Sequence, residues 1–132
     1  MKKMLLCLVL LCSVALPALA QTADVDGKFT ATLPDDMKAV ELTAEDKEDG
    51  LLIEMANDVL RFVAYYYEPD PSYIPTLDEM NENYLADQQE GFYASVAIEE
   101  LGGTRMIVYD TGEGTLGAIA ILEDGKTYEF IA

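Results

Sequence analysis

Residues 92–131 read FYASVAIEELGGTRMIVYDTGEGTLGAIAILEDGKTYEFI, and this stretch decides the fold class. Runs of apolar, β-branched and aromatic residues alternate in it with short turn signals, a pattern typical of an antiparallel meander. The turn signals are Gly102-Gly103, Gly112-Glu113-Gly114 and Asp124-Gly125. They divide the stretch into four predicted strands, at about residues 92–99, 104–110, 115–123 and 126–131.

Two apolar runs upstream of the meander, residues 51–56 and 59–68, predict a β-hairpin. Asn57-Asp58 separates the two runs. Both residue types tolerate the left-handed backbone that a two-residue hairpin turn requires, so we expect such a turn here.

The segment ahead of the hairpin predicts shorter elements. Residues 28–33 alternate between polar and apolar side chains, which predicts a strand that Pro34-Asp35-Asp36 ends. Residues 37–42 predict a short second strand. The charged residues 43–50 predict a loop with one helical turn.

One helix is predicted between the hairpin and the meander. Thr76 is a favoured N-cap residue, and Glu79 three positions later completes a capping box. Apolar residues at helical spacing then form one stripe: Leu77, Met80, Tyr84 and Leu85. With Gly91 after its last turn, the helix is expected to span about residues 77–90. The order of elements predicts an α+β fold, an antiparallel sheet of about six or seven strands with this helix on one face.

The predicted strands are apolar on both faces, whereas a sheet with one solvated face should alternate apolar and polar residues. In the predicted hairpin, Val63 and Tyr65 alternate with Phe62 and Ala64. One helix cannot cover both faces, so the second face needs another cover. Three explanations fit: residues 34–50 fold across it, it self-associates, or the chain lacks a final helix.

The first twenty residues are organised as a secretory signal peptide. Lys2 and Lys3 form a positive n-region, and residues 4–16 carry no charge. Ala18-Leu19-Ala20 places small residues at the −3 and −1 positions before Gln21. The uncharged run is shorter than the about 20 residues of a membrane-spanning helix. We therefore predict cleavage after Ala20 and a secreted or periplasmic protein.

Both cysteines, Cys7 and Cys12, belong to this predicted signal peptide. A bacterial lipoprotein would need a small residue just before the modified cysteine, and Leu11 stands before Cys12. Lipidation is therefore the weaker alternative. Cleavage would remove both thiols, so the apolar core must stabilise the domain without disulfides.

Cleavage would leave 112 of the 132 residues. We expect a flexible leader at residues 21–27 and a single domain at residues 28–132. Because Lys2 and Lys3 leave with the signal, the formal net charge changes from −17 to −19. This charge argues against binding to nucleic acid or to an anionic membrane. The absence of His excludes an imidazole base and His-ligated metals.

Several motifs occur in a recognisable order. F-x-x-x-L-P-D-D spans residues 29–36, T-L-D-E spans residues 76–79, a Gly-Gly turn follows at 102–103, and D-G-K-x-Y-x-F spans residues 124–130. This arrangement resembles the PsbP-like fold, and more closely its small secreted bacterial relatives, over about residues 27–132. The resemblance implies an antiparallel sheet between helical layers and a binding or assembly role without catalysis. Family members usually have a helix after the last strand, which this sequence lacks.

The segment YYYEPDPSY, from Tyr65 to Tyr73, is the most distinctive candidate for a ligand site. Tyrosines beside carboxylates at a strand end could stack on a sugar or hold a cation. The alternative is structural, because Tyr is a strand former and one face of the strand would lie in the core. The candidate ligand-binding residues are Tyr65, Tyr67, Glu68, Asp70 and Tyr73.

Two other chemistries would depend on acidic residues. Asp24-Val25-Asp26 has the spacing that begins a calcium loop, but Lys28 stands at the fifth position of the EF-hand pattern. Asp35-Asp36 and the acidic residues of 45–49 could bind Ca²⁺ loosely, or they form solvated loops. A carboxylate pair could also hydrolyse a glycoside. No catalytic residue, metal ligand or cofactor is predicted.

These observations favour a secreted, non-catalytic domain that binds or assembles with an envelope or extracellular partner. The partner would be another protein, or a second copy that binds through the second sheet face. A binding protein for a small ligand, a glycan or Ca²⁺, is the alternative. A carboxylate-based hydrolase is the third possibility. Neither nucleic acid nor, after signal cleavage, a membrane is expected as a partner.

Overall fold

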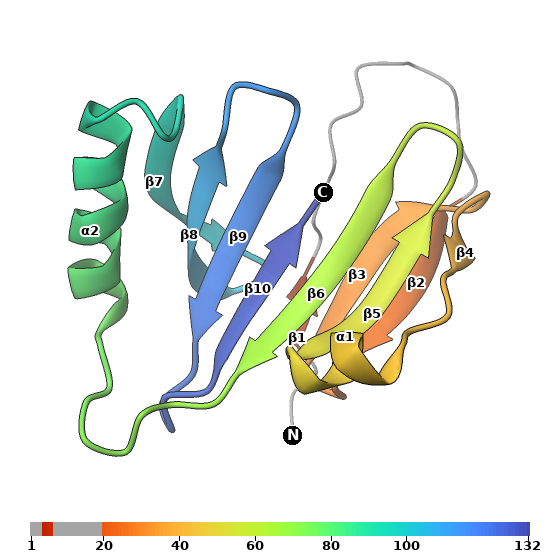
Figure 1. The fold of residues 1–132 in the computed structure, drawn as a ribbon, viewed down its shortest axis with the longest axis horizontal. Helices are drawn as coiled ribbons and strands as arrows, with labels where there is room; N and C mark the ends of the chain where they lie inside the picture. Colours follow the sequence, from red (N-terminus) through yellow and green to blue (C-terminus); the bar gives the residue numbers. More distant parts are fainter. Residues whose placement is uncertain (1–3, 7–19) are drawn as a thin grey trace.

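The computed structural model describes residues 4–6 and 20–132. The n-region and Ala18 of the predicted signal peptide lie outside these residues. The fold is α+β, as the sequence predicts: a seven-stranded antiparallel sheet, a smaller sheet and one main helix (Figure 1).

The last four strands form the predicted meander. They are β7 (Ser95–Leu101), β8 (Thr104–Asp110), β9 (Leu116–Ile121) and β10 (Thr127–Ile131). Strand β10 then pairs with β6 (Arg61–Tyr67) of the upstream hairpin. The strand order is therefore β4-β5-β6-β10-β9-β8-β7, with β10 in the middle of the sheet.

The upstream hairpin consists of β5 (Leu51–Ala56) and β6, but its turn is longer than predicted. Ala56 pairs with Arg61, so residues 57–60 form the loop. The side-chain oxygen of Asn57 accepts hydrogen bonds from the backbone N–H groups of Val59 (2.9 Å) and Leu60 (2.6 Å). Because this side chain satisfies the loop amides, neither Asn57 nor its neighbour Asp58 adopts a positive φ.

Residues 34–50 lie at the edge of the sheet rather than across it. Strand β4 (Lys38–Ala39) pairs with β5, and the short helix α1 (Ala44–Glu48) begins at a capping box formed by Thr43 and Asp46. Met37 is the only residue of the segment that is fully buried. Of the three explanations for the second sheet face, the one in which residues 34–50 fold across it is therefore wrong, because the segment extends the sheet at its edge through β4.

The second face is covered by the hairpin of β2 (Ala20–Val25) and β3 (Phe29–Pro34), which lies behind β5 and β6 in Figure 1. Its alternating pattern buries five apolar residues against the main sheet: Ala23, Val25, Phe29, Ala31 and Leu33. Residues 21–25 are thus a strand and not the predicted flexible leader, because Ala23 and Val25 supply an inward-facing pair. Strand β1 (Met4–Leu6) pairs in parallel with β3 and belongs to the predicted signal peptide.

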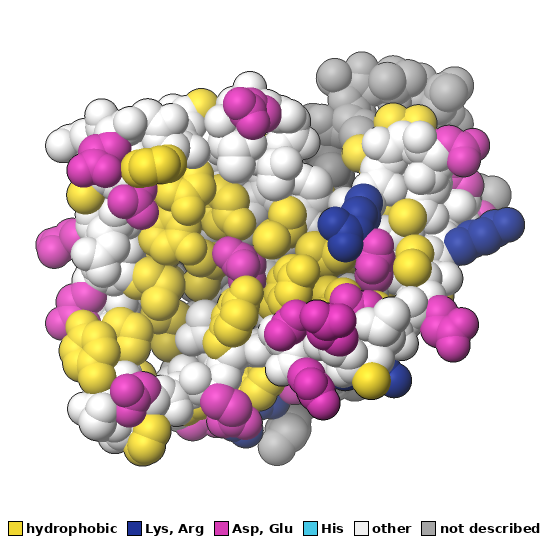
Figure 2. Space-filling model, viewed as in Figure 1, with side chains coloured by type: hydrophobic (Ala, Val, Ile, Leu, Met, Phe, Trp, Pro, Cys, Tyr) yellow, Lys and Arg dark blue, Asp and Glu magenta, His cyan; other side chains and the backbone are white. Residues whose placement is uncertain are grey.

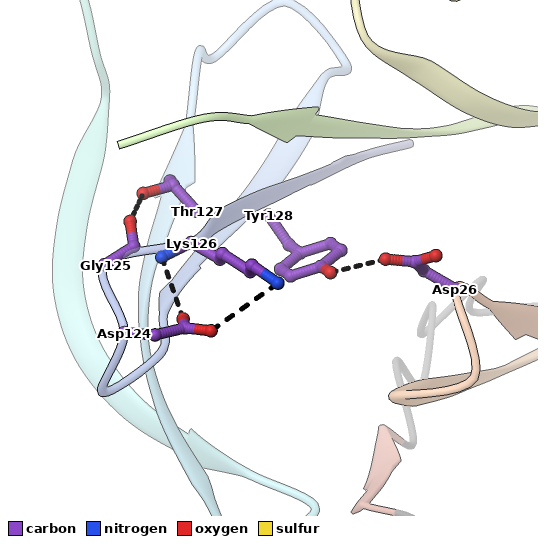
Figure 3. A network of polar contacts seen from close by, with 6 residues as sticks. All are labelled: Asp26, Asp124, Gly125, Lys126, Thr127 and Tyr128. Carbon is purple, nitrogen blue, oxygen red and sulfur yellow. Dashed lines mark hydrogen bonds and ion pairs between the residues drawn. The ribbon is translucent and has the colours of Figure 1, made fainter. Parts of the chain in front are cut away.

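A buried tyrosine connects this hairpin to the centre of the main sheet (Figure 3). The hydroxyl of Tyr128, on β10, donates a hydrogen bond of 2.6 Å to Asp26 in the β2–β3 turn. Asp26 has a φ of 55°, in the left-handed region that Asp tolerates better than most residues. The ring of Tyr128 packs on that of Phe29, with centroids 5.1 Å apart. The turn is therefore fixed in position above the sheet.

Helix α2 (Leu77–Gln89) covers part of the opposite face. Its capping box between Thr76 and Glu79 is present as predicted. Leu77, Met80 and Tyr84 of the predicted stripe pack onto the sheet. Leu85 stays exposed, because the part of the helix surface that contacts the sheet is narrower than the predicted stripe. The helix packs mainly on β7 and β8. The same face of β9, β10 and β6 is left partly open.

Candidate functional site

A carboxylate lies in the middle of the partly open sheet face. In the segment TYEFI of β10, Tyr128 and Phe130 point into the core beneath the β2–β3 hairpin, so Glu129 must point to the other face. Its cross-strand partners are Tyr65 on β6 and Ile119 on β9. A carboxylate among such neighbours loses hydration, which is costly unless hydrogen bonds replace it.

Two tyrosines supply these hydrogen bonds. The hydroxyl of Tyr67 donates to one oxygen of Glu129 at 3.2 Å, and the hydroxyl of Tyr109 donates to the other at 3.1 Å. Tyr109 lies two strands away, on β8, and its ring reaches Glu129 by crossing over Gly117 of β9. A Cβ atom at position 117 would overlap the Tyr109 ring, so glycine is required for this crossing.

The carboxylate lines a pocket between the sheet and α2, which we call the Glu129 hollow. The hollow has a volume of about 200 Å³. It is lined by Tyr67, Met80, Tyr84, Ile119, Thr127 and Glu129. Figure 2 shows hydrophobic side chains gathered over this part of the sheet beside α2, with an acidic side chain among them. The walls are thus mostly apolar and aromatic, and the base carries a negative charge.

A cluster of three packed tyrosine rings fixes the helix side of the hollow. The ring of Tyr84 lies 5.6 Å from Tyr109 and 5.2 Å from Tyr93, and Tyr93 lies 5.0 Å from Tyr109. On the other side, Tyr65 stacks on Tyr67 with centroids 6.2 Å apart. Such contacts restrict the rings and keep the walls of the hollow in place.

The phenols around Glu129 resist ionisation. Burial, followed by the charge of Glu129, raises the pKa of Tyr67 to about 12. The same two causes, in the same order, raise the pKa of Tyr84 and Tyr109 further. These hydroxyls therefore stay protonated at neutral pH, where they act as hydrogen-bond donors.

The structure brings together only two of the five predicted ligand-binding residues. Tyr65 and Tyr67 lie on the face of the hollow, beside Glu129. Glu68 is exposed beyond the end of β6. Asp70 accepts hydrogen bonds from the hydroxyl and then the backbone N–H of Ser72, and these bonds, in that order, lower its pKa. Tyr73 is 61% exposed and donates to Glu79 at the start of α2, away from the hollow.

Three of the acidic residues considered for Ca²⁺ take part in local structure. Asp24 accepts from the backbone of Gly27 in the β2–β3 turn, Asp36 accepts from the Asn57 side chain, and Asp46 caps α1. Within residues 4–6 and 20–132, no group of three acidic side chains is arranged to hold a metal ion. In the same part of the chain, no helix has the length and apolar character to cross a membrane.

The residues that sequence reasoning missed come from four separate elements: Met80 and Tyr84 on α2, Tyr109 on β8, Ile119 on β9, and Thr127 and Glu129 on β10. One signal for them exists in the sequence. In the run TYEFI, a single acid occupies the outward face of a strand whose neighbours are apolar on that face. No protein-family model matches the chain, and no similar protein was found among curated proteins.

Proposed function

We propose that this protein is a secreted, non-catalytic domain that binds a ligand in the Glu129 hollow. One observation carries the proposal: a preformed pocket on a half-covered sheet face, with a carboxylate held at its base by two tyrosines. Apolar walls with a few fixed polar groups are typical of binding sites for small ligands or for a protruding group of a partner.

The proposal moves the binding surface from where the sequence predicts it. The β2–β3 hairpin occupies the face for which a second copy or a partner is predicted, so the helix side is the open one. The predicted signal peptide supports a secreted or periplasmic location, and the resemblance to small bacterial PsbP-like proteins supports binding without catalysis. Ala20, the last residue of that signal, is also the first residue of β2.

The binding proposal is tested by ¹⁵N NMR of the chain from Gln21 onward, titrated with a library of neutral, cationic and anionic fragments. We expect some fragments to shift the amide signals of Ile119, Thr127 and Glu129, and to leave those of β2 and β3 unchanged. The matched variant Met80→Trp, which fills the hollow from the helix side, should abolish these shifts. Binding that maps elsewhere, or no binding by any fragment, would contradict the proposal.

The location is tested separately. Expression with residues 1–132 in a bacterial host should yield an exported protein whose first residue is Gln21, measured by intact-mass spectrometry. The variant Ala18→Arg, Ala20→Arg should accumulate uncleaved, because signal peptidase requires small residues at both positions. An exported protein of full-length mass in the unaltered chain would contradict the predicted cleavage.

A further inference from the structure

The charge of Glu129 is not neutralised by any cation of the described chain. The ion pairs in residues 4–6 and 20–132 join Arg61 to Glu54, Arg105 to Asp78, and Lys126 to Asp124. The contrast with Glu54 is informative, because it lies on the same sheet face, opposite Val63, and is paired with Arg61 at 2.6 Å. In the part of the chain that the structure describes, the hydrogen bonds to the Glu129 carboxylate come from two phenols.

Two hydrogen bonds leave the carboxylate with unused capacity. A carboxylate offers about four lone-pair sites, and the tyrosines occupy one on each oxygen. Glu129 lines the hollow together with Tyr67 and Tyr84. A positively charged group that enters the hollow would therefore meet both the carboxylate and aromatic walls.

We propose that the Glu129 hollow binds an organic ammonium ion, whose charged nitrogen lies beside the Glu129 carboxylate and whose alkyl groups contact Tyr67, Met80, Tyr84 and Ile119. This inference rests on the proposed binding function and names the chemical class of the ligand. Aromatic rings attract such ions through their negative faces, and alkyl substituents gain from burial against apolar walls.

The size of the hollow agrees with this class of ligand. Its volume is about 200 Å³, whereas a water molecule occupies about 30 Å³ of the liquid. It therefore accepts a group of several heavy atoms, such as a trimethylammonium head, with the rest of the ligand outside. An inorganic ion such as Ca²⁺ fits poorly, because it takes six to eight oxygen ligands and the hollow offers one carboxylate and few other oxygens.

The electrostatics of the whole chain point the same way. The formal net charge is −17, and a strongly acidic protein concentrates cations and repels anions near its surface. Inside the hollow, the negative charge of Glu129 lies close to the rings, where after burial it is the second cause that raises the pKa of Tyr67 and Tyr84. The same charge stabilises a bound cation.

The test compares choline with 3,3-dimethyl-1-butanol, a neutral molecule of the same shape, in calorimetric and NMR titrations at constant ionic strength set with NaCl. We expect choline to bind with millimolar affinity and at least about tenfold more tightly than the neutral molecule, because charge and cation–π attraction act on choline alone. Choline should shift the amide signals of Ile119 and Glu129.

Variants then locate the interaction. Glu129→Gln should weaken choline binding at least about tenfold, and Tyr84→Leu several-fold. The control Glu123→Gln, which removes an exposed carboxylate from the β9–β10 loop, should leave the affinity unchanged. Should Glu129→Gln fail to fold, Met80→Lys serves instead, since its tethered ammonium would compete for the same carboxylate and abolish choline binding.

The outcomes separate this inference from the proposed function. Equal affinity for choline and its neutral analogue, or unchanged choline binding in Glu129→Gln, would overturn the ammonium assignment. Neutral or anionic fragments that bind the hollow while choline does not would also overturn it, yet leave the binding function in place. A hollow that binds neither choline nor any fragment would overturn both.

Discussion

The hydrogen bond between Tyr128 and Asp26 joins the β2–β3 hairpin to the main sheet, and we expect it to contribute measurably to the free energy of unfolding. Tyr128 is fully buried in the centre of the main sheet, and its hydroxyl reaches the exposed Asp26 at 2.6 Å. A hydrogen bond to a charged group contributes about 1.5–3 kcal/mol to stability. After Tyr128→Phe, water can solvate the Asp26 carboxylate in place of the hydroxyl. We therefore expect the free energy of unfolding to fall by about 1.5 kcal/mol, the lower end of this range.

A double-mutant cycle isolates this bond from other effects. Asp26→Gly is the matched second change, because glycine tolerates the φ of 55° and removes only the side chain. Urea unfolding of the single and double variants should give a coupling energy of about 1–2 kcal/mol. For comparison, Tyr73→Phe removes an exposed hydroxyl and should change stability by less than about 0.5 kcal/mol.

A coupling energy below about 0.3 kcal/mol would refute this reasoning, because two residues that do not interact give a value that small. In that case the hairpin would be held by apolar packing alone, and Tyr128 would be replaceable by Phe without consequence. A change in the urea m value would instead indicate that the variant alters the compactness of the native or denatured state, or that unfolding is no longer two-state.

Three further predictions concern the hollow and the charge of the chain. Folding raises the pKa of Tyr67 from 10.0 to about 12, so the stability gained from its protonated hydroxyl is complete below pH 10 and is lost as the pH rises toward 12. A near-ultraviolet titration should therefore show tyrosine ionisation above pH 10 in the folded protein and near pH 10 in urea. Gly117→Ala should destabilise the domain by about 1–3 kcal/mol, because the new methyl group displaces the Tyr109 ring. An unchanged urea midpoint would contradict the placement of the Tyr109 ring over Gly117. Added NaCl should raise the melting temperature from low to moderate ionic strength, because 25 acidic residues face only eight basic ones in the full chain; a flat response would show that the charges are well paired.

Local signals in the sequence predict most of the secondary structure. Thr76 and Glu79 define the start of α2, and the Gly102-Gly103 turn defines a connection of the meander, because capping and turn formation depend on residues close in the chain. The excess of apolar residues on both strand faces also indicates that a second cover exists. None of the three explanations drawn from the sequence names the β2–β3 hairpin as this cover, because residues 21–25 look polar until they are paired with β3, where Ala23 and Val25 face inward.

The site depends on contacts between distant parts of the chain, which spacing does not reveal. Tyr67 and Glu129 are 62 positions apart, and they meet because β10 pairs with β6 and not only with its neighbour in sequence. Tyr65 and Tyr67 could be predicted as site residues from their unusual composition. Glu68 and Asp70 could not be excluded without the structure, because the chain leaves the sheet immediately after Tyr67.

The central position of β10 constrains the time at which the domain can form. The strands β5–β6 and β7–β8–β9 can pair among themselves as they are synthesised, but β10 joins the two groups and follows both in sequence. Until β10 emerges from the ribosome, each group has an unpaired edge, and the long-range pairings that unite the sheet are slow to form. The seven-stranded sheet is therefore expected to form late, when β10 joins two groups of strands that are already paired within themselves.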